Sequence, residues 1–183
     1  MKPINNLIYD VGMNNGSDTA YYLSKGFDVV GIEADPTLAE QCSSRFKREI
    51  DAGRLKILNL GIAKEPGMAS FYINETNSEW NSFDFKIASR DQSSYHVIEI
   101  GCRNFAHILN EYGVPYYLKV DIEGSDMLCI NELQADNLPM YVSVEASSID
   151  QLVQLKELGY KKFMCVEQYS HYPLIEPEYP VYR

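Results

Sequence analysis

The amino-acid sequence predicts an α/β protein built on a doubly wound, mostly parallel sheet. Short apolar runs alternate with segments whose apolar residues recur every three or four positions, which is typical of alternating strands and helices. The first run ends in a turn marked by Gly12 and Gly16, and the second run ends in Glu33. In a parallel sheet these ends meet at one edge, where backbone N–H groups and a helix N-terminus face a ligand.

Composition limits the class of protein. The 183 residues carry a net charge of −10 and no basic run, so no surface suited to nucleic-acid phosphates is visible. No apolar run reaches the length of a membrane span, and no leader peptide precedes the first strand. The cysteines stand singly, without a C-x-x-C pair, which favours reduced thiols in a cytoplasmic setting and argues against zinc. We expect one domain over residues 1–183.

The first strand and its turn carry the earliest site signal. Residues Leu7–Val11 are apolar except for Asp10, and Ser17 or Asp18 is placed to cap the helix that follows. A nearby carboxylate at a strand end suits a cationic ligand without phosphate, such as S-adenosylmethionine with its ammonium and sulfonium groups. We therefore assign Asp10 to the ammonium group.

The glycine spacing supports the same cofactor. The turn reads D-x-G-x-x-x-G and lacks the G-x-G-x-x-G of dinucleotide-binding turns, because Asn14 replaces the middle glycine. Gly12 and Gly16 let the chain approach the methionine part of the cofactor closely. An ordinary turn, in which the glycines serve only the bend, stays open as the alternative.

The second strand, Asp28–Glu33, ends in an acid. A carboxylate at the tip of the neighbouring strand can accept from both hydroxyls of a ribose, so Glu33 predicts a nucleoside-containing cofactor. Ala34 is assigned to the same pocket. Asp35 and Pro36 are expected to be the N-cap and first residue of a helix. The alternative for Glu33 is a solvated acid before a turn.

A helix over residues 36–52 and a third strand, Arg54–Ala63, are expected next. Gly61, at the end of that strand, could line the adenine side of a nucleoside pocket, and a plain strand terminus is the alternative. The regular alternation is then interrupted over Lys64–Ile100. We predict two short antiparallel strands there, Met68–Ile73 and Tyr95–Ile100.

The loop between these two strands contains Trp80, Asn81, Ser82, Phe83 and Arg90. A long loop with these residues could serve as a lid or substrate wall, or it could be decoration at the edge of the sheet. Both interpretations stay open.

The segment Tyr116–Gly124 is the most informative chemically. After a helix over Asn104–Tyr112, period-two alternation places Lys119, Asp121 and Glu123 on one face of a strand. Three charges are costly to bury unless they pair or point into a cleft. We expect Lys119 to neutralise Asp121 or Glu123 while one carboxylate faces cofactor and acceptor; a purely structural ion pair is the alternative.

The remaining elements complete the sheet. Glu145 is expected at the end of a strand and close to Asp121. Asp121, Glu123 and Asp126 could bind Mg²⁺, but nothing else points to a metal, and none is assigned. Beyond Gln168 the chain is expected to be irregular. The predicted elements are a helix over Asp126–Leu133, a strand over Met140–Ala146, a helix over Ile149–Leu158 closed by Gly159, and a strand over Lys161–Glu167.

Three motifs resemble the FkbM family of S-adenosylmethionine-dependent methyltransferases: D-V-G-M-N-N-G at 10–16, I-E-A-D-P at 32–36, and L-K-V-D-I-E-G at 118–124. The last is similar to that family's K-[IV]-D-[IV]-E-G signature. The likeness runs from about Leu7 to Gln168. It implies the Rossmann-like fold of class I methyltransferases and methyl transfer to a hydroxyl oxygen of a small molecule or sugar.

The resemblance also implies site residues. Asp10, Gly12, Asn14 and Gly16 would hold the methionine part and Glu33 the ribose, with Lys119, Asp121 and Glu123 at the reaction centre. A class I sheet normally closes with an antiparallel last strand. Residues Leu174–Arg183 offer no candidate for it, so we expect a sheet without that strand.

As mechanism, the acceptor oxygen would attack the sulfonium methyl group in line, and most of the acceleration would come from alignment. Asp121 is the first candidate for the base, with Glu123 and Glu145 behind it. Two other classes stay open. One is a nicotinamide-dependent oxidoreductase, which should carry Gly at the position of Asn14. The other is a catalytically idle domain that binds cofactor or a partner.

Overall fold

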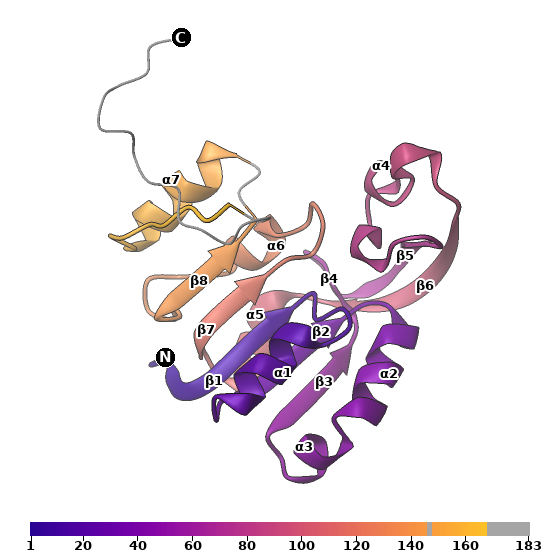
Figure 1. Ribbon diagram of the computed structural model, residues 1–183. Helices are drawn as coiled ribbons and strands as arrows, with labels where there is room; N and C mark the ends of the chain where they lie inside the picture. The colour runs from indigo at the N-terminus through magenta and orange to yellow at the C-terminus, as the bar shows by residue number, and fades with distance from the viewer. Residues whose placement is uncertain (146–147, 168–183) are drawn as a thin grey trace.

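The computed structural model describes residues 1–145 and 148–167. A sheet of five parallel strands in the order β3-β2-β1-β7-β8 forms its centre, as Figure 1 shows. Its strands are β1 (Ile4–Val11), β2 (Asp28–Glu33), β3 (Leu55–Asn59), β7 (Pro115–Val120) and β8 (Tyr141–Val144). The predicted α/β fold with a mostly parallel sheet is confirmed.

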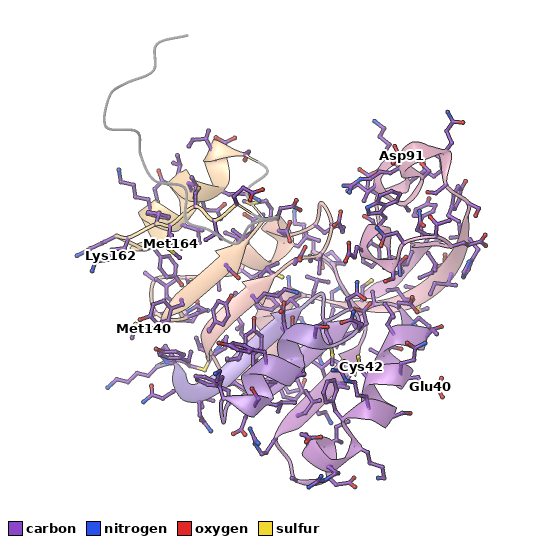
Figure 2. All side chains as sticks on the ribbon, viewed as in Figure 1. Glu40, Cys42, Asp91, Met140, Lys162 and Met164 are labelled. Atoms are coloured by element: carbon purple, nitrogen blue, oxygen red, sulfur yellow. The ribbon has the colours of Figure 1, made fainter. Side chains whose placement is uncertain are left out.

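A smaller sheet has the order β4-β6-β5 and contains β4 (Gly61–Ile62), β5 (Gly67–Asn74) and β6 (Tyr95–Arg103). Strands β5 and β6 are antiparallel, as predicted. In Figure 1 this hairpin extends away from the five-stranded sheet, with helix α4 (Phe85–Ala88) at its tip. Figure 2 places Asp91 at that tip, and Met140 and Met164 on the opposite side of the molecule.

Helices cover both faces of the central sheet. On one face α1 (Ser17–Ser24), α2 (Pro36–Arg45) and α3 (Lys47–Asp51) bury a core that includes Leu23 and Phe46. On the other face Tyr9, Phe105 and Leu118 belong to a second core. The helices there are α5 (Phe105–Tyr112), α6 (Met127–Ile130) and α7 (Ile149–Leu158). This two-sided burial is why the strands read as continuous apolar runs.

The two helix starts differ from each other. Asp35 caps α2 as predicted, because its Oδ1 accepts a 2.8 Å hydrogen bond from the backbone N–H of Thr37. The predicted cap of α1 is wrong. Gly16 is the N-cap, with φ +75° and no side-chain cap, while Asn15 Oδ1 accepts from the Ser17 N–H at 3.0 Å. The asparagine turn takes the place of a capping serine or aspartate.

Two predicted elements are divided. The helix over 36–52 breaks at Phe46, whose φ of −103° and ψ of +24° are not helical. The strand over 54–63 stops at Asn59. The Leu60 N–H makes the last hydrogen bond to β2, with the Glu33 carbonyl at 3.1 Å, and Gly61–Ile62 joins the smaller sheet instead. A continuous apolar run does not reveal such a change of sheet.

The region after β8 shows the main difference. Lys161–Glu167 does not form a strand, and its side chains through Val166 are exposed. The apolar run F-M-C-V therefore indicated burial that the described residues do not provide. The helix predicted from Asp126 to Leu133 is reduced to α6, whereas α7 and its closing Gly159 are confirmed. The predictions for Ala146, for the tail beyond Gln168 and for Leu174–Arg183 lie outside the described residues.

Candidate functional site

A cavity of about 350 Å³ lies at the carboxyl edge of the parallel sheet. This volume is within the range of small-molecule sites. Segments that follow β1, β2, β3 and β7 line it, together with residues between β5 and β6. The lining residues are Gly12, Met13, Asn14, Asn15, Ser17, Asp18, Ile32, Glu33, Ala34, Leu38, Leu60, Gly61, Ile62, Phe71, Ser78, Glu79, Asn81, Phe83, Lys119, Asp121, Ile122 and Glu123.

Gly12 is required by a close approach of two chain segments. Its φ is +79°, and a Cβ atom built there would lie 1.8 Å from the backbone oxygen of Asp121. No side chain fits that space without moving the backbone. The absence of a Cβ therefore brings the end of β1 against the end of β7 and forms one side of the cavity.

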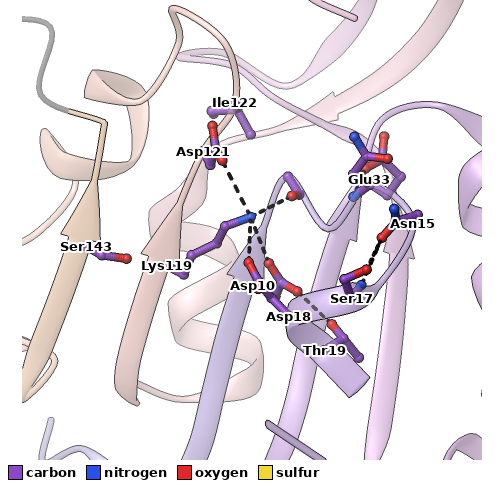
Figure 3. A network of polar contacts seen from close by, with 12 residues as sticks. Asp10, Asn15, Ser17, Asp18, Thr19, Glu33, Lys119, Asp121, Ile122 and Ser143 are labelled. Carbon is purple, nitrogen blue, oxygen red and sulfur yellow. Dashed lines mark hydrogen bonds and ion pairs between the residues drawn. The ribbon is translucent and has the colours of Figure 1, made fainter. Parts of the chain in front are cut away.

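Asp10 and Lys119 form a buried ion pair beneath this turn (Figure 3). The Lys119 Nζ atom lies 3.1 Å from Asp10 Oδ1 and donates to the Gly12 carbonyl at 2.8 Å. Thr19 Oγ1 donates to the other Asp10 oxygen at 2.7 Å. Asp10 is 0% exposed and does not line the cavity. The direct contact with a ligand ammonium predicted for Asp10 is thus replaced by contacts to Lys119 and Thr19.

Lys119 has the predicted ion pair with Asp121, at 4.0 Å, together with two pairs that were not predicted. Its ammonium lies closer to Asp10, at 3.1 Å, and to Asp18, at 3.8 Å. Burial by itself lowers the pKa of Lys119, but the carboxylates of Asp10 and Asp121 outweigh it and the pKa is raised. Burial raises the pKa of Asp10, and Lys119 opposes that shift. Lys119 therefore stays charged, and Asp10 and the Gly12 carbonyl hold its ammonium group in place.

Glu33 is held by backbone donors at the end of β2. Its Oε2 accepts from the Asn14 N–H at 2.7 Å and its Oε1 from the Asp35 N–H at 2.8 Å. The side chain is buried, yet the residue lines the cavity. Burial raises the pKa of Glu33 to about 7, and the two backbone hydrogen bonds oppose that rise. Each carboxylate oxygen still has lone pairs for a ligand hydroxyl.

The other predicted cofactor residues divide into two groups. Asn14, Ala34 and Gly61 line the cavity with Gly12, and Asn14 adopts a left-handed φ of +47°, a conformation that asparagine tolerates. Gly16 does not line the cavity. A Cβ there would meet the Phe46 ring at 2.6 Å, so Gly16 serves the packing of α1 on α2.

Carboxylates gather at the end of β7. Oxygen atoms of Asp121, Glu123 and Glu145 lie within 4.8 Å of one another, as expected for Glu145 and Asp121. Arg90 contacts Glu123 at 3.1 Å and pairs with it in place of Lys119. Burial raises the pKa of Glu123, Arg90 opposes the rise, and Glu145 and Asp121 add to it. Such a group can accept a proton or hold a hard cation.

Asp126 does not join these carboxylates. Its Oδ1 accepts a hydrogen bond from the Ile122 N–H at 3.0 Å, and the residue is buried. The sequence grouped Asp126 with Asp121 and Glu123. In the structure the third carboxylate of this group is that of Glu145. Asp126 instead fixes the turn that leads into α6.

The loop between β5 and β6 forms a wall of the cavity, which is one of the two alternatives that the sequence left open. Asn81 and Phe83, which the sequence placed in that loop, line the cavity, whereas Trp80 does not. Ser78 and Glu79 also line it and were not singled out, because the length of a loop does not indicate which of its side chains face a ligand.

Among the described residues, no helix is both long and apolar enough to cross a membrane.

A family model and solved structures of known proteins are similar to this chain. A family model described as the methyltransferase FkbM domain matches residues 10–162. The crystal structure of methyltransferase FkbM from Methylobacillus flagellatus KT is similar, with 19% identity and a TM-score of 0.56 over 84% of this chain and 36% of that one. The chain thus corresponds to about a third of that protein.

A crystal structure of precorrin-6y C5,15-methyltransferase from Geobacter metallireducens GS-15 also matches, with 10% identity and a TM-score of 0.48, over 96% of this chain and 75% of that one. The search of curated proteins gives no match.

Proposed function

The chain belongs to the FkbM methyltransferase family, and on that premise we propose that it transfers the methyl group of S-adenosylmethionine to a hydroxyl oxygen of a small molecule or sugar. With a net charge of −10, a small acceptor is favoured over a nucleic acid. The whole-protein activity of the relatives is not assumed, because the chain covers 36% of the matched structure.

One observation carries the proposal. The same cavity contains Glu33 on one side and Asp121 and Glu123 on the other, with the glycine turn between them. Glu33 offers acceptor oxygens to a ribose, and the space next to Gly12 suits close approach of the methionine part. These features fit the cofactor that the family uses. When bound, that cofactor supplies an electrophilic methyl group on sulfur.

The residues of the chain then have distinct tasks. Glu33, Ala34 and Gly61 bind and orient the nucleoside, while Gly12 and Asn14 contact the methionine part. Asp121 takes the proton from the acceptor hydroxyl, and Glu123 and Glu145 are the next candidates for that role. Asp10 does not line the cavity and acts by holding Lys119, which does.

Methyl transfer is the test. The purified chain is incubated with methyl-labelled S-adenosylmethionine and a library of sugars and small alcohols, and transfer is measured by the label in product. Label on a hydroxyl oxygen supports the proposal. Label on nitrogen or carbon acceptors alone contradicts the O-methylation part of it.

Two other functions are separated by a titration. S-adenosylhomocysteine and NADH are added in turn to the protein in a calorimeter. Binding of NADH alone would establish an oxidoreductase, which Asn14 in the glycine turn disfavours. Tight binding of S-adenosylhomocysteine with no transfer to any acceptor would establish a domain that binds cofactor without catalysis.

A further inference from the structure

The loop between β5 and β6, residues 75–94, has a defined shape that depends on one buried side chain. Asn74 is buried, and its Oδ1 accepts at 2.8 Å from the Thr76 N–H, the Thr76 hydroxyl and the Asn77 N–H. Its Nδ2 donates to the Ala88 carbonyl at 2.7 Å. A buried amide with this many partners fixes the backbone around it.

The same loop is attached to the body of the protein on two sides of the cavity. Near β2, Asn81 Nδ2 donates to Asp35 Oδ2 at 3.0 Å. Near β7, the Ser82 hydroxyl donates to the Glu123 carbonyl at 2.8 Å, and Arg90 pairs with the Glu123 carboxylate at 3.1 Å. The β5–β6 loop therefore bridges the cavity, which decoration at a sheet edge would not require.

Phe83 directly follows Asn81 and Ser82, which make the attachments near β2 and near β7. A Cβ on Gly61 would be 2.4 Å from Phe83 Cζ, so the ring lies directly against Gly61. Its centroid is 4.8 Å from that of Phe71. Both rings line the cavity, but Phe71 is only 4% exposed whereas Phe83 is half-buried. Phe83 is therefore the ring of the pair with more surface left for a ligand.

The surroundings of Phe83 suit a flat aromatic group. The ring occupies the space that a Cβ on Gly61 would take, and the apolar side chains of the lining include Leu38, Leu60 and Ile62. Stacking of a nucleobase on an aromatic side chain contributes about 1–3 kcal/mol. We propose that Phe83 contacts the purine ring of the cofactor, and that the β5–β6 loop is the wall closing the nucleoside end of the site.

This inference rests on the proposed function and is tested by binding, without turnover. S-adenosylhomocysteine and methylthioadenosine, which lacks the amino-acid part, are titrated at pH 8 into wild type, Phe83→Leu and Phe83→His in a calorimeter. Phe83→Leu keeps apolar bulk but loses the ring, so the affinity for both ligands should fall about tenfold or more, which corresponds to about 1.4 kcal/mol. Phe83→His keeps a flat aromatic ring and adds no atom toward Gly61, so it should bind both ligands more tightly than Phe83→Leu does.

A matched control stands two residues away. Phe85 is exposed and does not line the cavity, so Phe85→Leu should bind both ligands as wild type does. The melting temperature of each ligand-free variant is recorded. An equal loss of affinity in Phe83→Leu and Phe83→His, in step with their melting temperatures, would show a structural role and overturn the inference.

The remaining outcomes are also distinct. Failure of wild type to bind either ligand would overturn the proposed function itself. Wild-type binding with unchanged affinity in Phe83→Leu would overturn only the role of Phe83. Weaker binding of S-adenosylhomocysteine with unchanged methylthioadenosine affinity would assign the ring to the methionine part and contradict the purine contact.

Discussion

The two ends of the cavity hold their carboxylates in opposite ways. At one end Glu33 is 6% exposed, and each of its oxygens accepts from a backbone N–H. At the other end the side chain of Asp121 is 44% exposed, and its oxygens lie within 4.8 Å of those of Glu123 and Glu145. The first arrangement is fixed by the fold, and the second depends on charges that repel one another.

This difference indicates a division of work. A carboxylate positioned by backbone donors keeps its geometry when side chains elsewhere move, which suits recognition of a ribose. At the other end, burial and the neighbouring carboxylates of Glu145 and Asp121 raise the pKa of Glu123, which suits a site that accepts a proton. Beneath both ends, the Asp10–Lys119 pair supports the turn that separates them.

The largest expected effect comes from removing that support. Lys119→Met leaves the Asp10 carboxylate buried without its cation, which should lower the free energy of unfolding by about 3–5 kcal/mol. Urea unfolding at pH 8 measures it. Asp10→Asn combined with Lys119→Met should recover part of the loss. Lys47→Met, which breaks an exposed pair with Asp51, should change stability by no more than about 0.5 kcal/mol.

The division of work between the two ends predicts a split between turnover and binding. Asp121→Asn should lower methyl transfer by about 100-fold or more, because the acceptor proton has no base, while affinity for S-adenosylhomocysteine changes less than about threefold. Turnover with an acceptor from the library and calorimetric titration measure the two quantities. Full turnover in this variant would remove Asp121 from the role of base.

The close approach of the turn after β1 to Asp121 can be tested by substituting two glycines. Gly12 and Gly26 both have positive φ, but only at Gly12 does a Cβ meet a neighbour within 4 Å. Gly26→Ala should cost about 1 kcal/mol for the backbone conformation alone. Gly12→Ala should cost about 2 kcal/mol more and also weaken cofactor binding. Equal melting temperatures for the two variants would contradict the close approach to Asp121.

The last expected effect is a pH dependence of cofactor binding at the Glu33 end. With a pKa of about 7, the carboxylate becomes protonated below neutral pH and accepts ribose hydroxyls less well. Affinity for S-adenosylhomocysteine should be constant above about pH 8 and fall by up to about tenfold per pH unit below about pH 6. Isothermal titration at five pH values measures this.

The free energy of unfolding of the ligand-free protein should change with pH in the opposite direction to the ligand affinity. A raised pKa in the folded state means that the native protein binds more protons than the unfolded chain between pH 4.5 and about 7. This group therefore lowers the free energy of unfolding as the pH rises through that window, by about 3 kcal/mol at most. Glu33→Gln should flatten both curves, and unchanged curves would contradict the assignment.

Much of the fold could be predicted because its signals are local. Asp35 followed by Pro36 determines a helix start, and Glu33 at a strand end determines one side of the cavity. The motif around Lys119 correctly drew attention to the end of β7. These features depend on residues that are neighbours in the sequence, so pattern and spacing were sufficient.

The remaining features depend on contacts between distant segments. Asp10 on β1 pairs with Lys119 on the adjacent strand β7, and Arg90 of the β5–β6 loop contacts Glu123. Phe83 meets Gly61 through a change of sheet that a single apolar run conceals. Spacing along the chain contains no information on these pairs. The contact of Lys119 with Asp121, at 4.0 Å, was therefore predicted, but its closer contact with Asp10 and the pair of Arg90 with Glu123 were not.

The central claim is that Glu33 and the glycine turn bind S-adenosylmethionine at the carboxyl edge of the sheet. Thermal unfolding of wild type and Glu33→Ala, with and without S-adenosylhomocysteine at about 100 times its dissociation constant, tests it most directly. We predict that the wild-type melting temperature rises by roughly 5–10 °C, as mass action requires for about 2.7 kcal/mol, and that Glu33→Ala hardly responds. An equal rise in both proteins, or no rise in wild type, would contradict the account.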